Sequence, residues 1–228
     1  TPTSSGLGTS GAMNLIWLAL ISQIKPTKKI PTKTKLKFAE DVYKIEQAMG
    51  LVGGKQDQYA SAFGGINFIE FKRDNVKLEQ LKLSKNFIKK LENKLVLVYT
   101  GKPHFSGNTN KLMIENLKRD KNTKNLLAIK NIAIQMKNAL KRQDIYKFAN
   151  LMNEETNERK KLHKDIVGKQ SQDIIKKGME NDAISAKVCG SGGGGSILFF
   201  TDNKTKLKKA FKNKVIDFKF DFEGLRYL

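Results

Sequence analysis

A loop of small residues runs directly into an apolar segment near the start of the chain, and this junction constrains the fold more than any other feature. The loop reads Ser4-Ser5-Gly6-Leu7-Gly8-Thr9-Ser10-Gly11-Ala12, and Met13–Ile21 follows it. Glycines adopt φ > 0 without a Cβ penalty and let the backbone approach a ligand closely. A helix that begins here presents unpaired N–H groups and the positive end of its dipole. The junction is therefore suited to an anionic phosphate.

The loop is not a Walker A motif, because no G-x-x-x-x-G-K-[ST] pattern occurs in the chain. Thr9 and Ser10 add hydroxyl groups that can ligate Mg²⁺ or bond a phosphate oxygen. The alternative is a Ser/Gly-rich turn that only caps a buried helix. The loop by itself does not decide between the two interpretations.

The 228 residues suffice for one large or two small domains, and 39% hydrophobic with 29% charged residues indicates a globular chain. Because the chain starts at Thr1 with no strand before the loop, we expect it to be a fragment that lacks its original N-terminus.

The formal net charge of +21 raises the question of nucleic-acid binding. Only five of the 43 basic residues are arginine, and the lysines are spread over every segment. Sites that read bases or clamp phosphates favour the fork geometry of arginine. The composition therefore predicts no specific nucleic-acid partner, and non-specific attraction to polyanions is a side effect.

Cys189 is the single cysteine, so there is no disulfide framework and a reducing compartment is expected. Met13–Ile21 is shorter than the about 20 apolar residues that span a bilayer. No basic region precedes it, so it is not a signal peptide. These features predict a cytoplasmic protein without a membrane partner.

Hydrophobic periodicity predicts several helices and strands. Helices are expected over residues 12–24, 36–49, 56–63, 111–118, 126–142, 145–164, 174–179 and 204–211, and strands over 66–72, 95–99, 184–189, 197–201 and 215–222. Phe199, Phe200, Phe218, Phe220 and Phe222 are expected in the core. Helices and strands without a repeating parallel βαβ rhythm favour the α+β class. A second unit should begin near Leu78, and we place the domain boundary so that residues 1–85 and 86–228 form two domains.

Asp57 follows a glycine-rich turn in the segment Gly53-Gly54-Lys55-Gln56-Asp57. A carboxylate in this position can approach a substrate hydroxyl and orient it or take its proton. The alternative is an N-cap aspartate for the short helix that follows, which is a common arrangement.

Glu46 lies eleven residues before Asp57, on the same predicted helical face as Val42 and Tyr43. One inward-pointing carboxylate with the hydroxyl of Thr9 or Ser10 would suit Mg²⁺ and leave positions for water and phosphates. The alternative is an exposed glutamate paired with a lysine.

A glycine run, Gly190-Ser191-Gly192-Gly193-Gly194-Gly195-Ser196, separates two apolar strands. Flexible linkers seldom sit tightly between two strands, so a loop that approaches a ligand or another backbone is favoured. His104 and His163 lack partners at metal-ligand spacing, so a zinc site is not predicted. Cys189 is expected to pack as a small hydrophobe.

The loop Ser5–Ala12 resembles the second signature motif of the GHMP kinases, and residues 187–195 resemble their third, glycine-rich motif. Residues 54–71 resemble the sugar-kinase branch, which includes D-glycero-D-manno-heptose 7-phosphate kinases and fucokinases. The resemblance implies a two-domain α+β fold. Its parts would be the remainder of an N-terminal domain like the second domain of ribosomal protein S5, and a ferredoxin-like C-terminal domain.

The resemblance also implies transfer of the γ-phosphoryl group of ATP, with Mg²⁺, to a hydroxyl of a sugar or sugar phosphate. Asp57 would orient the attacking hydroxyl or accept its proton, and Thr9, where the family usually has serine, would ligate Mg²⁺ together with Glu46. The ATP phosphates would contact Ser4, Ser5, Gly6, Leu7, Gly8, Thr9, Ser10, Gly11, Ala12, Gly190, Ser191, Gly192 and Gly193. The substrate would contact Gln56, Gln58, Tyr99 and Gly192, and residues 99–108 would face it.

The chain departs from the family in two places: the first GHMP motif is absent, and Ser191 stands where the third motif usually has alanine. A kinase of the mevalonate, phosphomevalonate, fucose or galactose type is an alternative. A non-catalytic ligand-binding relative and a basic nucleic-acid-binding module are the non-enzymatic alternatives. A homodimer is a further expectation.

Overall fold

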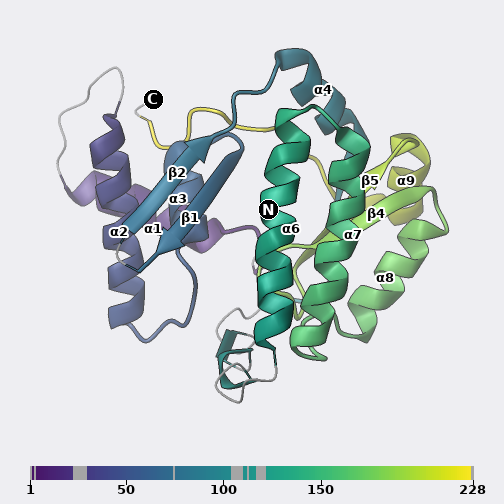
Figure 1. The fold of residues 1–228 in the computed structure, drawn as a ribbon, viewed down its shortest axis with the longest axis horizontal. Coiled ribbons are helices and arrows are strands. Elements are labelled where there is room, and N and C mark those ends of the chain that lie inside the picture. Colours follow the sequence, from purple (N-terminus) through teal and green to yellow (C-terminus); the bar gives the residue numbers. More distant parts are fainter. Residues whose placement is uncertain are drawn as a thin grey trace. The chain divides into compact units, whose positions relative to one another are not determined.

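The computed structural model describes residues 2, 4–22, 30–73, 75–103, 110–111, 113–116 and 122–226. The chain divides into two compact units (Figure 1). The small unit comprises Gly8–Leu81 and Phe220–Leu228, and the large unit comprises Thr1–Leu7 and Lys82–Lys219. Among the described residues, no helix is both long enough and apolar enough to cross a bilayer.

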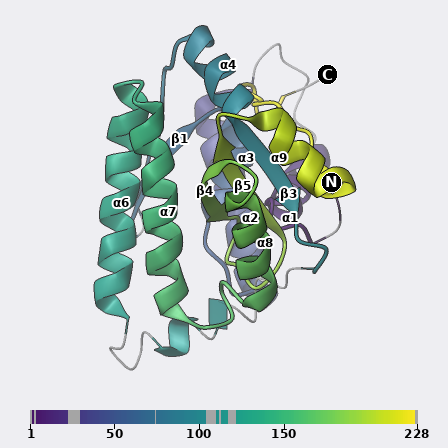
Figure 2. The same cartoon turned by 90° about the vertical axis from the view of Figure 1, so that its right-hand side faces the viewer.

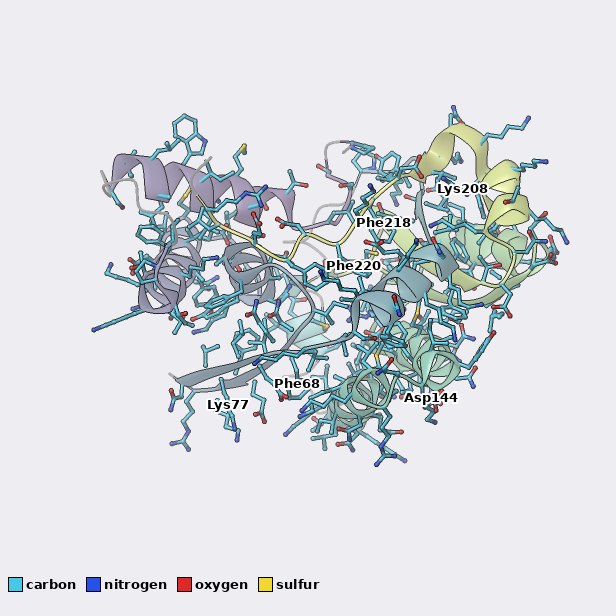
Figure 3. The ribbon with its side chains drawn as sticks, turned by 90° about the horizontal axis from the view of Figure 1, so that it is seen from above. Phe68, Lys77, Asp144, Lys208, Phe218 and Phe220 are labelled. Carbon is cyan, nitrogen blue, oxygen red and sulfur yellow. The ribbon has the colours of Figure 1, made fainter. Side chains whose placement is uncertain are left out.

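The small unit combines helices with a β-hairpin. Its elements are α1 (Thr9–Ile21), α2 (Thr32–Ala48), α3 (Gln56–Phe63), β1 (Asn67–Lys72) and β2 (Asn75–Gln80). The two strands pair antiparallel from Asn67 opposite Gln80 to Lys72 opposite Asn75. On β2 the alternation turns Val76 and Leu78 toward the core, whereas Lys77 projects away from the sheet (Figure 3). The core contains Leu15, Phe38, Ala39, Val42, Tyr59, Ala62 and Phe63.

The last part of the chain completes the small unit. Leu225 is buried in its core, and the Leu225 amide donates to the Ala62 carbonyl oxygen at 3.1 Å. Gly64 has φ +63°, and a Cβ there would lie 2.5 Å from the Gly224 nitrogen. Only glycine therefore permits this close approach of the two backbone segments.

The large unit is built on a four-stranded antiparallel sheet with the strand order β4-β5-β3-β6. Its described elements are α4 (Lys85–Lys94), β3 (Leu95–Tyr99), α6 (Thr123–Lys141), α7 (Ile145–Leu162), α8 (Lys169–Met179), β4 (Ala183–Val188), β5 (Ser196–Thr201), α9 (Lys204–Phe211), η1 (Lys212–Lys214) and β6 (Val215–Ile216). Helices α7 and α8 pack on β4, and α6 runs beside α7 (Figure 2).

Local sequence explains these elements. Strand β3 reads LVLVY and is almost wholly buried, as expected for a strand covered on both faces. The side chains of Ser84, Asp144 and Asn203 cap α4, α7 and α9 by accepting backbone N–H bonds. Phe199 stacks on Phe211 with 5.5 Å between ring centroids. The α+β class predicted from the sequence is confirmed.

The structure corrects several expected elements. Helix α1 begins at Thr9, three residues earlier than expected, so Thr9 and Ser10 lie in its first turn. Leu78 pairs with Ile69 in the hairpin, and the main segment of the large unit begins four residues later, at Lys82. The last strand ends at Ile216. The helix expected over 111–118 lies partly outside the described residues, and the domain boundary at residue 85 stays a prediction.

The expected phenylalanine core is also corrected. Phe199 and Phe200 are fully buried, whereas Phe222 is 44% exposed and Phe218 and Phe220 are half-buried. Strand β6 ends at Ile216, so the later phenylalanines lie outside the sheet.

Candidate active site

The carboxylate of Asp57 lies against the glycines of the opening loop. Asp57 is in the first turn of α3, where the helix dipole favours a negative charge. A Cβ on Gly8 (φ +71°) would lie 3.0 Å from the Asp57 Cγ, and one on Gly11 would lie 3.3 Å from the Asp57 Cβ. The N-cap of α3 is Lys55, so the interpretation of Asp57 as an N-cap is wrong. The loop glycines bring the start of α1 against a carboxylate.

Glu46 is held by two amide side chains from the neighbouring helices. Its Oε1 accepts a hydrogen bond from Asn14 Nδ2 on α1 at 2.9 Å, and its Oε2 accepts one from Gln58 Nε2 on α3 at 2.5 Å. The half-buried carboxylate is thus oriented by α1 and α3. The alternative of an exposed glutamate paired with a lysine is wrong.

The two carboxylates influence each other. Burial raises the pKa of Asp57, and the nearby Glu46 carboxylate raises it further. A cation would relieve this repulsion, and carboxylate and hydroxyl oxygens are the ligands that Mg²⁺ prefers. No cluster of three or more His, Cys, Asp or Glu side chains suited to a metal occurs among the described residues.

In the large unit, the glycine run folds onto the first part of the opening loop. A Cβ on Gly190 would lie 3.0 Å from the Gly6 carbonyl oxygen, and one on Gly195 would lie 2.7 Å from that of Ser5. The expectation that this run approaches another backbone is confirmed. Ser5 is buried, and its Oγ has no hydrogen-bond partner within the described structure. An unsatisfied hydroxyl in a glycine-lined loop suits a phosphate oxygen.

A cluster of charged side chains supports the glycine run. Arg159 Nη1 donates to the Gly190 carbonyl oxygen at 3.0 Å, and Arg159 Nε donates to Glu155 Oε1 at 2.7 Å. Glu155 also pairs with Lys187 Nζ at 2.8 Å. Burial alone would raise the pKa of Glu155, but Lys187 and Arg159 hold it below its ordinary value.

Cys189 lies between this cluster and the glycine run. Burial raises the pKa of its thiol to about 11, so the thiol is protonated at neutral pH. A protonated thiol is a poor nucleophile, which agrees with the packing role expected for this residue.

The residues predicted to contact the substrate have different surroundings. Gln58 is buried and donates a hydrogen bond to Glu46, whereas Gln56 is exposed at the start of α3. Tyr99 ends β3 opposite Ser196. Gly192 packs on the protein itself, since a Cβ there would lie 2.3 Å from the Ile166 carbonyl oxygen. Of the loop expected to face the substrate, residues 104–108 lie outside the described part of the chain.

Sequence reasoning missed Asn14 and the cluster of Glu155, Arg159 and Lys187. Asn14 is the one polar residue in the segment Ala12–Ile21. Its position among apolar residues was the sequence feature that could have marked it as a candidate site residue. The spacing of Glu155 and Arg159 indicates a pair one helical turn apart. Their contact with a residue beside the glycine run depends on the tertiary fold.

Two comparisons bear on the class of protein to which this chain belongs. Residues 136–214 match the family described as GHMP kinases C terminal. The chain is 32% identical to D-glycero-alpha-D-manno-heptose 7-phosphate kinase of Campylobacter jejuni, over 99% of this chain and 67% of that enzyme. The chain belongs to the GHMP kinase family, and the resemblance seen in its motifs is confirmed.

Two further relatives carry sugar-kinase names. The crystal structure of a D-glycero-D-manno-heptose 1-phosphate kinase from Bacteroides thetaiotaomicron is 28% identical, with a TM-score of 0.66, over 98% of this chain and 63% of that one. A bifunctional fucokinase/GDP-fucose pyrophosphorylase of Arabidopsis thaliana is 27% identical over 91% of this chain and 20% of that protein. The chain thus spans two thirds or less of the length of these relatives.

Proposed function

We propose that this protein is an ATP-dependent kinase that transfers a phosphoryl group to a hydroxyl of a sugar or sugar phosphate. The observation that carries the proposal is the approach of Gly8 to the Asp57 carboxyl group and of Gly11 to the Asp57 Cβ, at the N-terminus of α1. A helix N-terminus suited to phosphate beside a carboxylate of raised pKa supports phosphoryl transfer to a hydroxyl.

The phosphates of ATP would bind to the continuous loop Ser4–Ala12 and to Gly190–Gly193. The first N–H groups of α1 have no acceptor within the helix, so they are available to an anion. Ser5 Oγ, which is buried without a partner in the described structure, supplies a further donor. Thr9 and Glu46 would hold Mg²⁺, which when bound neutralises charge on the phosphates.

Asp57 would accept the proton of the attacking hydroxyl. In this reaction the acceptor oxygen bonds to the γ-phosphorus, the bond from that phosphorus to the β–γ bridging oxygen breaks, and ADP leaves. The raised pKa of Asp57 makes its carboxylate a better proton acceptor than an exposed aspartate. Positioning of the two reactants supplies much of the remaining rate enhancement.

The heptose 7-phosphate kinase relative makes a heptose phosphate our first choice of substrate. Gln56, Gln58, Tyr99 and Gly192 stay predictions as substrate contacts. A cytoplasmic location, expected from the single cysteine, and a homodimer also stay predictions.

The direct test is an ADP-release assay with Mg·ATP and a panel of D-glycero-D-manno-heptose 7-phosphate, fucose, galactose and mevalonate. Release of ADP with a sugar or sugar phosphate, and not with mevalonate, is expected. A second readout is the melting temperature, which ATP should raise by mass action even where the acceptor is absent from the panel. If no ADP is released with any member of the panel and ATP also fails to raise the melting temperature, the kinase function is refuted.

A further inference from the structure

A carboxylate outside the candidate site holds the start of α3. Both oxygens of Glu40, on α2, accept hydrogen bonds from Lys55 Nζ, at 3.0 and 3.1 Å. Glu40 Oε2 also accepts a hydrogen bond from the Tyr59 hydroxyl at 2.8 Å. Lys55 is the N-cap of α3 and Tyr59 lies four residues later, so the two side chains share one face of the helix. Glu40 therefore ties both ends of the first turn of α3 to α2, and we call these three residues the Glu40 triad.

The side chains of the Glu40 triad are mostly shielded from water. The side chain of Lys55 is 16% exposed and that of Glu40 is 28% exposed, and Tyr59 belongs to the core of the small unit. Burial alone would raise the pKa of Glu40, but hydrogen bonds from Tyr59 and Lys55 hold it below its ordinary value. Burial and the hydrogen bond to Glu40 raise the pKa of Tyr59. Glu40 is thus ionised and Tyr59 protonated at neutral pH, which are the forms that these charge-assisted bonds require.

The partner of Glu40 is not the one that α2 by itself would favour. Lys44 lies four residues later on the same helix, which is the spacing of an ordinary surface pair. Lys44 acts on Glu40 by its charge, whereas both carboxylate oxygens bond to Lys55. The Lys55 ammonium also lies over the ring of Tyr43, 4.8 Å from its centroid, in a cation–π contact. Helix α2 thus holds this ammonium with two side chains that are about one turn apart.

Asp57 lies inside the turn that the Glu40 triad holds. The start of α1 is so close that a Cβ on Gly8 would lie 3.0 Å from the Asp57 Cγ, so a small shift of α3 would change this contact. A displacement of about 1 Å at a reacting group can cost about 10²-fold in rate. We propose, on the basis of the kinase function proposed above, that Glu40 is a positioning residue for Asp57. Glu40 acts through Lys55 and Tyr59 and not on the substrates themselves.

Substitutions in the triad should lower kcat and leave the nucleotide bound. Glu40→Gln keeps the size of the side chain and removes its charge, and we expect kcat to fall roughly 10- to 10²-fold with an unchanged KM for ATP. Lys55→Met keeps the apolar stem and should lower kcat by a similar factor. The two losses should not add in the double variant, because both remove the same contact. The matched control is Lys44→Met, which removes the exposed lysine one turn along α2 and should leave kcat unchanged.

Charge reversal separates the pair from its individual side chains. Glu40→Lys and Lys55→Glu should each lower kcat, and the two together should restore most of it, because the opposite charges meet again and the Tyr59 hydroxyl can accept a hydrogen bond from a lysine. A folded double-reversal variant that is as slow as the single variants would overturn the inference. Leu78→Ala, on β2 beside the core of the small unit, measures the effect of lost stability alone. If it lowers kcat as much as Glu40→Gln does, Glu40 does not position Asp57.

Hydrogen exchange tests the tie without kinase activity. In Glu40→Gln the amides of residues 59–63 on α3 should exchange about tenfold faster, whereas those of α7 in the large unit should keep their rates. Unchanged exchange on α3, or a loss of kcat in Lys55→Met without one in Glu40→Gln, would overturn the inference. If the wild-type protein releases no ADP with any acceptor and ATP does not stabilise it, the proposed function fails. Faster exchange on α3 in Glu40→Gln would still support the tie, so the two can fail separately.

Discussion

Arg159 donates a hydrogen bond from Nη1 to the carbonyl oxygen of Gly190 at 3.0 Å, which ties α7 to the first residue of the glycine run. Arg159 is itself oriented by Glu155, which is almost fully buried and also pairs with Lys187. The conformation of a loop with little side-chain packing thus depends on three charged side chains.

Glu155→Ala should destabilise the protein strongly, because it leaves Lys187 and Arg159 without their common partner. Loss of one member of a buried ion cluster costs about 3 kcal/mol or more. Urea unfolding would measure this loss. The control is Lys208→Met, which removes the surface pair with Asp217 and should barely change the unfolding midpoint. Similar midpoints for the two variants would contradict a supporting role for Glu155.

Gly8→Ala should reduce the rate of phosphoryl transfer more than it reduces the stability of the fold. Its positive φ costs roughly 1–2 kcal/mol for alanine, and the new Cβ would contact the Asp57 carboxyl group at 3.0 Å. We expect a loss of phosphoryl transfer larger than the loss of stability accounts for. Gly53→Ala is the control, because a Cβ there meets nothing within 4 Å and Gly53 has no positive φ. An active Gly8→Ala enzyme would contradict the need for this close approach.

Asp57→Asn should retain ATP binding and lose phosphoryl transfer by about 10²- to 10⁴-fold, the usual contribution of a positioned general base. ADP release gives the rate, and stabilisation by ATP on heating shows that the nucleotide still binds. Asp173→Asn, at an exposed carboxylate on α8, should behave as wild type. Turnover near the wild-type rate in Asp57→Asn would show that this carboxylate does not take the proton.

Glu46→Gln should lower the pKa of Asp57 toward its ordinary value, because the neighbouring negative charge is removed. The folded protein binds a proton at Asp57 more tightly than the unfolded chain does. The free energy of unfolding therefore falls as pH rises from the unfolded to the folded pKa of Asp57, and Glu46→Gln should reduce that fall. Carboxyl NMR titration would measure the pKa directly.

The same variant should raise the Mg²⁺ concentration needed for activity about tenfold or more, since even changes outside the ligand shell weaken metal binding by that factor. Asp41→Asn, which removes the α2 carboxylate paired with Lys37, is the control for both readouts. An unchanged Mg²⁺ titration in Glu46→Gln would remove Glu46 from the metal site.

The features that the sequence predicted correctly depend on local chemistry. The glycine run was predicted to approach another backbone because linkers seldom sit between apolar strands, and Leu95–Tyr99 was predicted as a buried strand from its continuous apolar residues. Both interpretations need only a few neighbouring residues.

The features that were missed depend on distant partners. Strand β2 carries only two apolar residues, Val76 and Leu78, and becomes a strand through its pairing with β1. The alternation in 215–222 continues past the point where the backbone leaves the sheet. Asn14 and Glu46 are 32 residues apart, and no local pattern links them.

The small unit takes its last core side chain, Leu225, from the far end of the chain. During synthesis the residues from Gly8 to Leu81 therefore leave the ribosome long before their own core can close. The large unit is complete by Lys219 and can fold first. The buried side of α1, which carries Leu15, therefore gains its complete core only once Leu225 has been made.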